Sequence, residues 1–212
     1  VGTDRLYVDA CSAMLVRRPW DVDVMGMENM FGGMHTELTA GLIAKVLGLP
    51  IKRFIAATNS NDTVPRFLQD GRWQPHATQA TLSNAMDVSN PNNWPRIQHL
   101  LDQGLIDAAE LSAVAISEAD TVQAVRDLDA LGYLSEPHAA LAYKALQDSL
   151  QAGEFGVFLG TAHPAKFKDS VESILGRDID VPNVLLAASR RPAWNGRITA
   201  DYAALKAQLL LL

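Results

Sequence analysis

The stretch EFGVFLGTAHPAKFK, residues 154–168, decides the fold that the sequence predicts. Its apolar run at 155–159 is short and rich in aromatic and β-branched residues, which is typical of a buried strand. Pro164 fits the first turn of a helix, because that position needs no N–H donor. Thr161 and His163 should therefore lie at the carboxyl end of a strand, where open α/β sheets bind ligands. An ordinary strand–loop–helix connection without a ligand is the alternative.

Outside this stretch, hydrophobic periodicity predicts an alternation of strands and helices. Strands are expected at 51–57 and, more weakly, at 21–25, with an extended segment at 77–82. Helices are expected at 38–47, 64–68, 95–103, 108–116, 122–131, 137–152, 164–175 and in the tail from 198. This alternation predicts an α/β fold with a largely parallel sheet flanked by helices. Residues 36–212 are expected to form that domain, and residues 1–35 stay unassigned.

Composition limits the possible partners and the compartment. The 212 residues are 48% hydrophobic and 20% charged, as in ordinary globular proteins. The net charge of −6 argues against nucleic acid and anionic membranes as partners. The single Cys11 excludes an internal disulfide framework, and no apolar run is long enough to span a bilayer. The first residues make a poor signal peptide, so a cytoplasmic location is expected.

Three polar clusters lie next to predicted element ends, and each has a structural alternative. The first could bind an anion, since short amides and hydroxyls donate hydrogen bonds and arginine pairs with phosphate or carboxylate. Turn and cap chemistry would explain it equally well. The second, SEPH at 135–138, is favoured as a helix N-terminus. The third contains Thr161, His163 and Lys166. The first cluster comprises Ser83, Asn84, Asp87, Ser89, Asn90, Asn92, Asn93 and Arg96.

Several common site motifs are absent from the sequence. The five histidines are scattered and the one cysteine has no companion, so no metal site is predicted. There is no GxSxG elbow and no Walker loop. By spacing alone, Gly32-Gly33 is too short to count as a phosphate-binding loop.

Four segments together resemble the C-terminal half of bacterial threonine synthase, a pyridoxal-phosphate (PLP) enzyme. The resemblance is nearly continuous over 38–176, weaker at 105–120 and loose after Gly176. The segments are LTAGLIAKVLGLPIKRFIAATNSNDTVPRFLQDG (38–71), ATQATLSNAMDVSNPNNWPR (77–96), LGYLSEPHAALAYKAL (131–146) and LGTAHPAKFKDSVESILG (159–176).

This resemblance implies a tryptophan-synthase-β-like fold (fold type II), in which PLP lies between two α/β domains. It also implies the conversion of O-phospho-L-homoserine and water to L-threonine and phosphate. Thr161 would hydrogen-bond the ring nitrogen of PLP. A set of polar residues would shape the substrate side of the pocket: Ser83, Asn84, Asp87, Asn92 and Arg96.

The chain departs from the family pattern at two places. The family has a Ser-Gly-Asn-Phe-Gly-Asp loop around the cofactor phosphate immediately before LTAG, where this chain reads GGMHTE. Gly33 matches in the ungapped register, and Gly32 matches in a gapped one. The family's Schiff-base lysine lies in an N-terminal half without a counterpart here, so no catalytic residue is assigned. The chain is expected to be a fragment that needs the missing half, and residues 1–35 have no clear kinship.

Two other functions remain open at this point. One is a different fold type II PLP lyase, such as a hydroxy-amino-acid dehydratase, although SNAMDVSNPNNWPR at 83–96 resembles threonine synthase specifically. The other is a non-catalytic remnant that binds a ligand or a partner chain, which the altered phosphate loop and the missing lysine favour.

Overall fold

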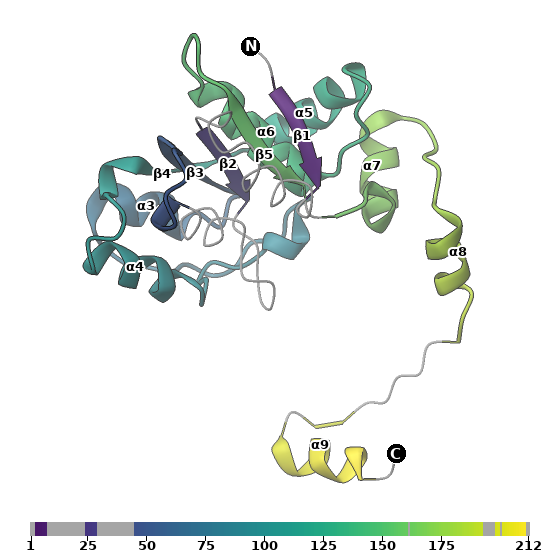
Figure 1. The fold of residues 1–212 in the computed structure, drawn as a ribbon. Helices are drawn as coiled ribbons and strands as arrows, with labels where there is room; N and C mark the ends of the chain where they lie inside the picture. The colour runs from purple at the N-terminus through teal and green to yellow at the C-terminus, as the bar shows by residue number, and fades with distance from the viewer. Residues whose placement is uncertain are drawn as a thin grey trace. The chain divides into compact units, whose positions relative to one another are not determined.

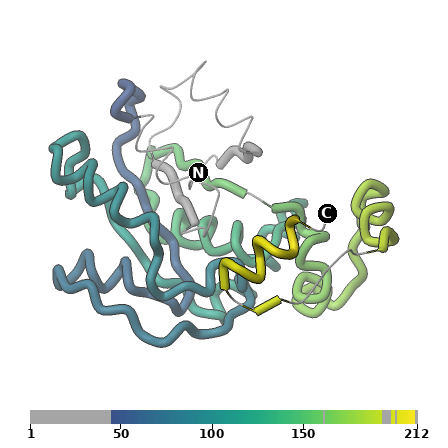
Figure 2. Tube along the Cα trace, turned by 90° about the horizontal axis from the view of Figure 1, so that it is seen from below, coloured from purple at the N-terminus to yellow at the C-terminus, as the bar shows by residue number. Residues whose placement is uncertain are grey.

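The computed structural model describes the backbone of residues 3–7 and 24–28, and residues 45–160, 162–192, 198–199 and 201–210 in full. The chain divides into two compact units, Val1–Ile179 and Asp180–Leu212. The first unit carries the sheet. The second contains the helices α8 (Asn183–Ser189) and α9 (Tyr202–Leu209). The trace of residues 45–192 can be followed in Figure 2.

The described residues form one five-stranded sheet in which every pairing is parallel (Figure 1). The strand order is β1-β5-β2-β3-β4. Because all strands run in the same direction, their carboxyl ends lie at one edge of the sheet. The strands are β1 (Thr3–Tyr7), β2 (Val24–Glu28), β3 (Arg53–Thr58), β4 (Leu111–Ala115) and β5 (Gly156–Gly160).

Both faces of the sheet are covered by helices. Along β3, Phe54 and Ala56 join one apolar cluster while Ile55 and Ala57 join the other. Helices α3 (Thr63–Asp70) and α4 (Trp94–Asp102) contribute to the first cluster. Helices α5 (Glu118–Ala130), α6 (Pro137–Ser149) and α7 (Lys168–Leu175) contribute to the second. Burial on both faces explains why the predicted central strands read as continuous apolar runs.

Helix α6 is the most deeply buried helix of the described chain and lies against β2, β3 and β5. Its alanines let the helix approach the sheet closely. At the start of β5 a side chain on Gly156 would bring its Cβ within 2.8 Å of Cδ1 of Leu146. Glycine at this position therefore allows the contact between α6 and β5.

The structure confirms most of the predicted elements. The strands expected at 51–57 and 155–159 are β3 and β5. The helices expected at 64–68, 95–103, 122–131 and 137–152 are α3, α4, α5 and α6. The helix expected at 164–175 begins as the 3-10 helix η4 (Pro164–Phe167), continues as α7 and ends at Gly176, where φ is 67°. The tail contains α9.

Several expectations differ from the structure. The helix predicted at 108–116 is wrong, because only the 3-10 turn η3 (Ala108–Glu110) is helical before β4 begins. Residues 111–115 pair in register with β3, Leu111 opposite Phe54. Strand β1 and helix α8 were not predicted, β2 overlaps the weak strand at 21–25, and 77–82 forms no strand. The helix expected at 38–47 and the domain boundary at 35/36 fall largely on residues outside the described set.

Candidate functional site

The carboxyl edge of the sheet is the first place to look for a ligand site, because parallel α/β sheets bind ligands there. Strand β3 ends at Thr58, β4 at Ala115 and β5 at Gly160. The N–H of Ile116 donates to the carbonyl oxygen of Thr58 over 2.8 Å, which extends the pairing of β3 and β4 to this edge. The buried Asn59 follows directly.

A polar network surrounds Asn59, whose exposed fraction is 1%. Its Nδ2 lies 2.9 Å from Oγ1 of Thr81, 3.0 Å from Oγ of Ser83 and 3.1 Å from Oδ1 of Asp87. The N–H of Thr81 donates to Oδ2 of Asp87 over 3.0 Å. An amide nitrogen only donates hydrogen bonds, so this cluster of oxygens suits it. The network therefore ties the segment at 81–87 to the end of β3.

Asn61 extends the network. Its Nδ2 donates to Oδ1 of Asn59 and to the carbonyl oxygen of Gln79, both over 2.9 Å. The N–H of Gln79 donates back to Oδ1 of Asn61 over 2.9 Å. The irregular stretch at 76–89 is thus held by side-chain bonds, since it has no regular secondary structure apart from η2 (Asn84–Met86).

The five predicted substrate residues fall into two groups. Ser83 is fully buried, and both Ser83 and Asp87 accept hydrogen bonds from Asn59. Turn chemistry, the structural alternative given above, therefore explains the side-chain bonds of these two residues. Asn84, Asn92 and Arg96 are exposed, and their side chains make no hydrogen bond to the described residues. The role of all five in substrate binding stays a prediction.

The SEPH segment at 135–138 is the start of α6, as predicted, and is buried. The Glu136 carboxylate accepts from the N–H groups of His138 and Ala139, each over 2.8 Å. It also accepts from Nδ1 of His138. Nε2 of that ring accepts from the N–H of Ala85 over 3.1 Å. A ring nitrogen that accepts carries no proton, so the bond from Ala85 matches the tautomer in which Nδ1 donates to Glu136.

The end of β5 is closely packed. A Cβ on Gly160 would lie 3.1 Å from the hydroxyl oxygen of Tyr133 and 3.5 Å from Cβ of Ala139.

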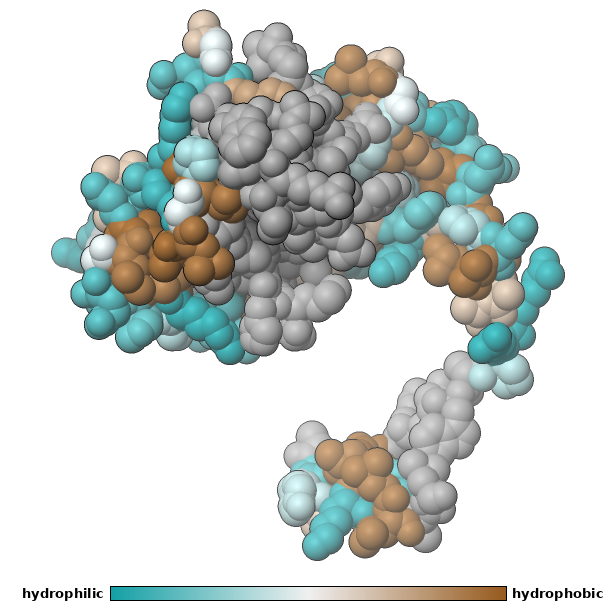
Figure 3. Space-filling view, viewed as in Figure 1, coloured by the Kyte–Doolittle hydropathy of each residue, from teal (hydrophilic) through white to brown (hydrophobic). Residues whose placement is uncertain are grey.

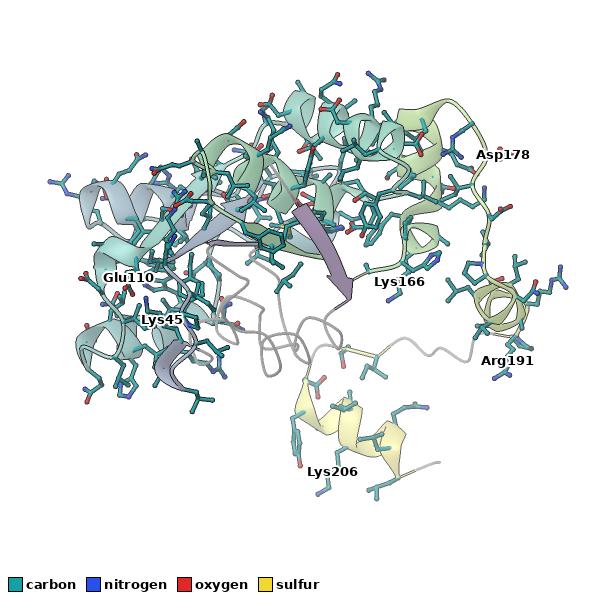
Figure 4. All side chains as sticks on the ribbon, turned by 45° about the horizontal axis from the view of Figure 1, so that its top comes forward. Lys45, Glu110, Lys166, Asp178, Arg191 and Lys206 are labelled. Carbon is teal, nitrogen blue, oxygen red and sulfur yellow. The ribbon has the colours of Figure 1, made fainter. Side chains whose placement is uncertain are left out.

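In the third cluster, Nδ1 of His163 accepts from the N–H of Ala165 over 3.1 Å and so caps η4. Lys166 is exposed (Figure 4). The predicted cofactor ligands Thr161, Gly32 and Gly33 lie outside the described residues.

The six lysines lie in ion pairs or at exposed positions within the described chain, and the absence of a Schiff-base lysine stays a prediction. Nζ of Lys45 lies 2.5 Å from Glu110 (Figure 4). The side-chain hydrogen bond from Lys144 to Asp148 raises the pKa of Lys144, which favours the charged amine, whereas a nucleophilic amine must be neutral. Lys168 pairs with Glu172. Lys52, Lys166 and Lys206 are exposed.

Two buried oxygen atoms at the carboxyl edge have no hydrogen-bond partner in the described structure: Oγ1 of Thr58 and Oε1 of Glu118. The other carboxylate oxygen of Glu118 accepts from the N–H of Leu82 over 2.9 Å. Unpaired buried oxygens are rare and call for an explanation, and a polar ligand at this edge would provide one. The described residues contain no cluster of three or more histidine, cysteine or carboxylate groups that could hold a metal ion, and no helix long and apolar enough to cross a membrane.

The comparison with known families matches residues 139–208 to a family described as "Threonine synthase, C-terminal". The chain is 59% identical to threonine synthase of Escherichia coli over 174 residues, which is 82% of this chain. By sequence, this chain belongs with the C-terminal part of the threonine synthases. The family match runs past Gly176 to residue 208, so it covers most of the tail, which inspection of the sequence related to the family only loosely.

Solved structures of threonine synthase have the same fold. The crystal structure of the Escherichia coli enzyme matches 92% of this chain with a TM-score of 0.82 and 52% identity. A PLP-bound threonine synthase from Brucella melitensis matches 86% of this chain with a TM-score of 0.72 and 27% identity. The α/β fold type II architecture is therefore as predicted. The chain spans 41% of the length of the Escherichia coli threonine synthase sequence and 45% of the chain in its crystal structure.

Sequence inspection missed the residues whose side chains bond to the segment at 83–87. Asn59 and Asn61 were read only as part of a polar turn, and His138 only as part of a helix start. One signal was available for the asparagines: they come directly after a predicted strand, at the edge where ligands bind.

Proposed function

We propose that this chain is the C-terminal, cofactor-holding part of a PLP-dependent threonine synthase, which converts O-phospho-L-homoserine and water to L-threonine and phosphate. The observation that carries this proposal is the 59% identity to threonine synthase of Escherichia coli over 174 residues. The fold agrees as well, because the crystal structure of the Escherichia coli enzyme matches this chain with a TM-score of 0.82.

The carboxyl edge of the sheet fits a polar cofactor such as PLP, because Thr58 and Glu118 present buried oxygens without partners there. Thr161 would offer its hydroxyl to the ring nitrogen, and Gly32 and Gly33 would approach the cofactor phosphate with their backbone N–H groups. PLP, when bound, supplies an electron sink for bond breaking at the substrate.

The substrate phosphate would be recognised by the polar segment at 83–96. Arg96 is exposed and can pair with phosphate through two parallel N–H bonds. Asn84 and Asn92 are exposed amides that can donate as well. Ser83 and Asp87, bonded to Asn59, would hold this segment in place.

The active site would be completed by an N-terminal part that this chain, spanning 41% of its Escherichia coli relative, does not match. That part would supply the Schiff-base lysine, and the chain alone would be inactive. We place the reaction in the cytoplasm, since a chain with the single Cys11 suits a reducing compartment. The dehydratase alternative is less well supported, since no observation on the described residues favours it over threonine synthase.

A chimera tests the proposal. The N-terminal part of the Escherichia coli enzyme that this chain does not match would be joined to this chain, and phosphate release from O-phospho-L-homoserine would be measured. We expect release from the chimera and none from this chain alone. Release of ammonia from threonine or serine instead would favour a dehydratase. A folded chimera that binds PLP and releases neither product would favour a non-catalytic remnant.

Thr161 is tested in the same chimera. Thr161→Ser keeps a hydroxyl and should keep most of the activity. Thr161→Val keeps the shape but leaves the ring nitrogen unpaired, which costs about 1–3 kcal/mol and lowers the rate roughly ten- to hundredfold if the loss falls in the chemical step. A valine variant with unchanged visible spectrum and single-turnover rate would remove Thr161 from the site.

A further inference from the structure

The ring of His138 lies where three segments of the chain meet. It belongs to the first turn of α6. Through Nε2 it accepts a hydrogen bond from Ala85 in η2, 53 residues earlier in the chain. Its ring centroid is 4.5 Å from that of Phe167, the last residue of η4, which follows β5. One buried side chain therefore contacts both segments that the sequence predicts for ligand binding.

Both nitrogens of His138 are used, although the ring is only 1% exposed. Nδ1 donates to the carboxylate of Glu136, which fixes the orientation of the ring. Nε2 is thereby left free of a proton and can accept from Ala85. Glu136 already caps α6 through the N–H groups of His138 and Ala139. Capping of α6 thus needs the carboxylate but not the imidazole, so the ring has another role.

The N–H of Ala85 has its acceptor in this ring. Within η2 the backbone bonds run from Met86 to Ser83 over 2.8 Å and from Asp87 to Asn84 over 3.1 Å. The N–H of Ala85 takes no part in these bonds, and its acceptor is Nε2 of His138 in a partly buried hydrogen bond, although Ala85 itself is exposed. This bond ties an exposed turn of the chain to a buried ring. His138 therefore anchors the centre of the segment at 83–87.

We propose that His138, oriented by Glu136, is a positioning residue that holds the substrate-side segment at 83–87 against η4, the 3-10 helix that follows β5. The anchoring itself follows from this chain's own contacts. Only what the two segments bind rests on the proposed function. In the complete enzyme, loss of His138 would let the two sides move apart without removing any group that touches the substrate or PLP.

Amide hydrogen exchange of this 212-residue chain tests the anchoring without any activity. His138→Phe keeps a ring against Phe167 and removes both nitrogens. His138→Gln places a carbonyl oxygen near the position of Nε2. We expect the Ala85 amide to exchange at least tenfold faster in the phenylalanine variant and to recover most of its protection in the glutamine variant. Amides of β3 should be unchanged. His99→Phe, at an exposed position on α4, is the matched control.

Two results would overturn the proposal. One is an Ala85 amide that exchanges as slowly in a folded His138→Phe variant as in the unchanged chain. The other is independent of any variant: nitrogen NMR of the unchanged chain reports which ring nitrogen of His138 carries the proton. A proton on Nε2, alone or with Nδ1, would exclude the bond from Ala85, so this measurement decides the matter even if the phenylalanine variant fails to fold.

The chimera separates this inference from the proposed function. If the chimera is active, His138→Phe should lower kcat/KM for O-phospho-L-homoserine at least tenfold while PLP affinity changes less than threefold, and His138→Gln should restore most of the loss. Unchanged kcat/KM in the phenylalanine variant would contradict a positioning role in the reaction. If the chimera is inactive, the proposed function fails, and amide exchange still decides whether His138 anchors the segment at 83–87.

Discussion

The helices α6 and α9 have similar sequences and opposite surroundings. α6 reads PHAALAYKALQDS and α9 reads YAALKAQL, so both are rich in alanine and leucine and contain one lysine. In α6 nine residues from Pro137 to Leu146 are buried, whereas no residue of α9 is. Figure 3 shows apolar side chains on the surface of α9, where Leu205 is 45% and Leu209 is 59% exposed. Local sequence accounts for both helices, but only contact with the sheet buries one of them.

The largest effect is expected from truncating the buried helix. Leu146→Ala removes a fully buried side chain that packs over Gly156, so it leaves a cavity. The free energy of unfolding should fall by about 2–5 kcal/mol. Leu209→Ala, in the exposed helix, should change it by less than about 0.5 kcal/mol. Urea unfolding measures both free energies. Equal losses in the two variants would show that burial does not distinguish α6 from α9.

The second prediction asks whether α9 gains a partner in a longer chain. Leu209 is 59% exposed, and Leu209→Lys should leave the stability of this chain unchanged. In the chimera, α9 should be covered by the added N-terminal part, because an apolar helix surface is stabilised by burial. The same substitution should then lower the free energy of unfolding of the chimera by about 1.5–3 kcal/mol. Thermal or urea unfolding of both proteins decides this, and equal effects in both would leave α9 without a partner there.

The third prediction concerns the close approach of α6 to β5. Gly156→Ala would place Cβ 2.8 Å from Cδ1 of Leu146, which is itself fully buried and has little room to move. Overpacking of this kind should cost about 1–3 kcal/mol. Combining Gly156→Ala with Leu146→Ala should cost less than the sum of the two single changes, since the second removes the clash. Strict additivity in a double-mutant cycle would show that the two residues do not press on one another.

The smallest effect is expected at the start of α9. The side-chain hydrogen bond from Thr199 and the backbone N–H of Ala204 lower the pKa of Asp201. A depressed pKa in the folded helix means that this cap stabilises α9 above the ordinary aspartate pKa of about 3.9 and is lost as the pH falls through the lower, folded value. The protection of the α9 amides, measured against the intrinsic exchange rate at each pH, should therefore fall below that pH, and Asp201→Asn should remove this dependence.

The sequence predicted those elements whose local pattern and tertiary surroundings agree. Strands β3 and β5 are apolar runs that end near glycine or polar turns, and α6 has Pro137 in its first turn. β4 was taken for a helix, because the DAAELSAVA stretch at 107–115 is rich in residues that also suit helices, and only pairing with β3 makes it a strand. Tertiary contact decided the outcome there.

For the candidate site, the sequence identified residues but not their bonds. Ser83 and Asp87 were predicted to bind substrate, yet their partner Asn59 lies 24 and 28 residues away. His138 bonds to Ala85 across 53 residues. Local patterns report capping and periodicity over a few positions, so contacts at these separations cannot be read from them. Family resemblance located the stretch at 83–96, and the structure shows which of its residues bond within the network around Asn59.

The strand order has a consequence for the time course of synthesis. β1 and β2 both precede residue 29, but β5 lies between them in the sheet and ends at Gly160. Among the described residues β1 pairs with β5 alone, so it lacks this neighbour until β5 has left the ribosome. At about 5–20 residues per second this delay is on the order of ten seconds. During that time β1 lacks its described partner and offers an edge that chaperones can bind, and translation speed thereby sets how long the nascent chain remains open to misassembly.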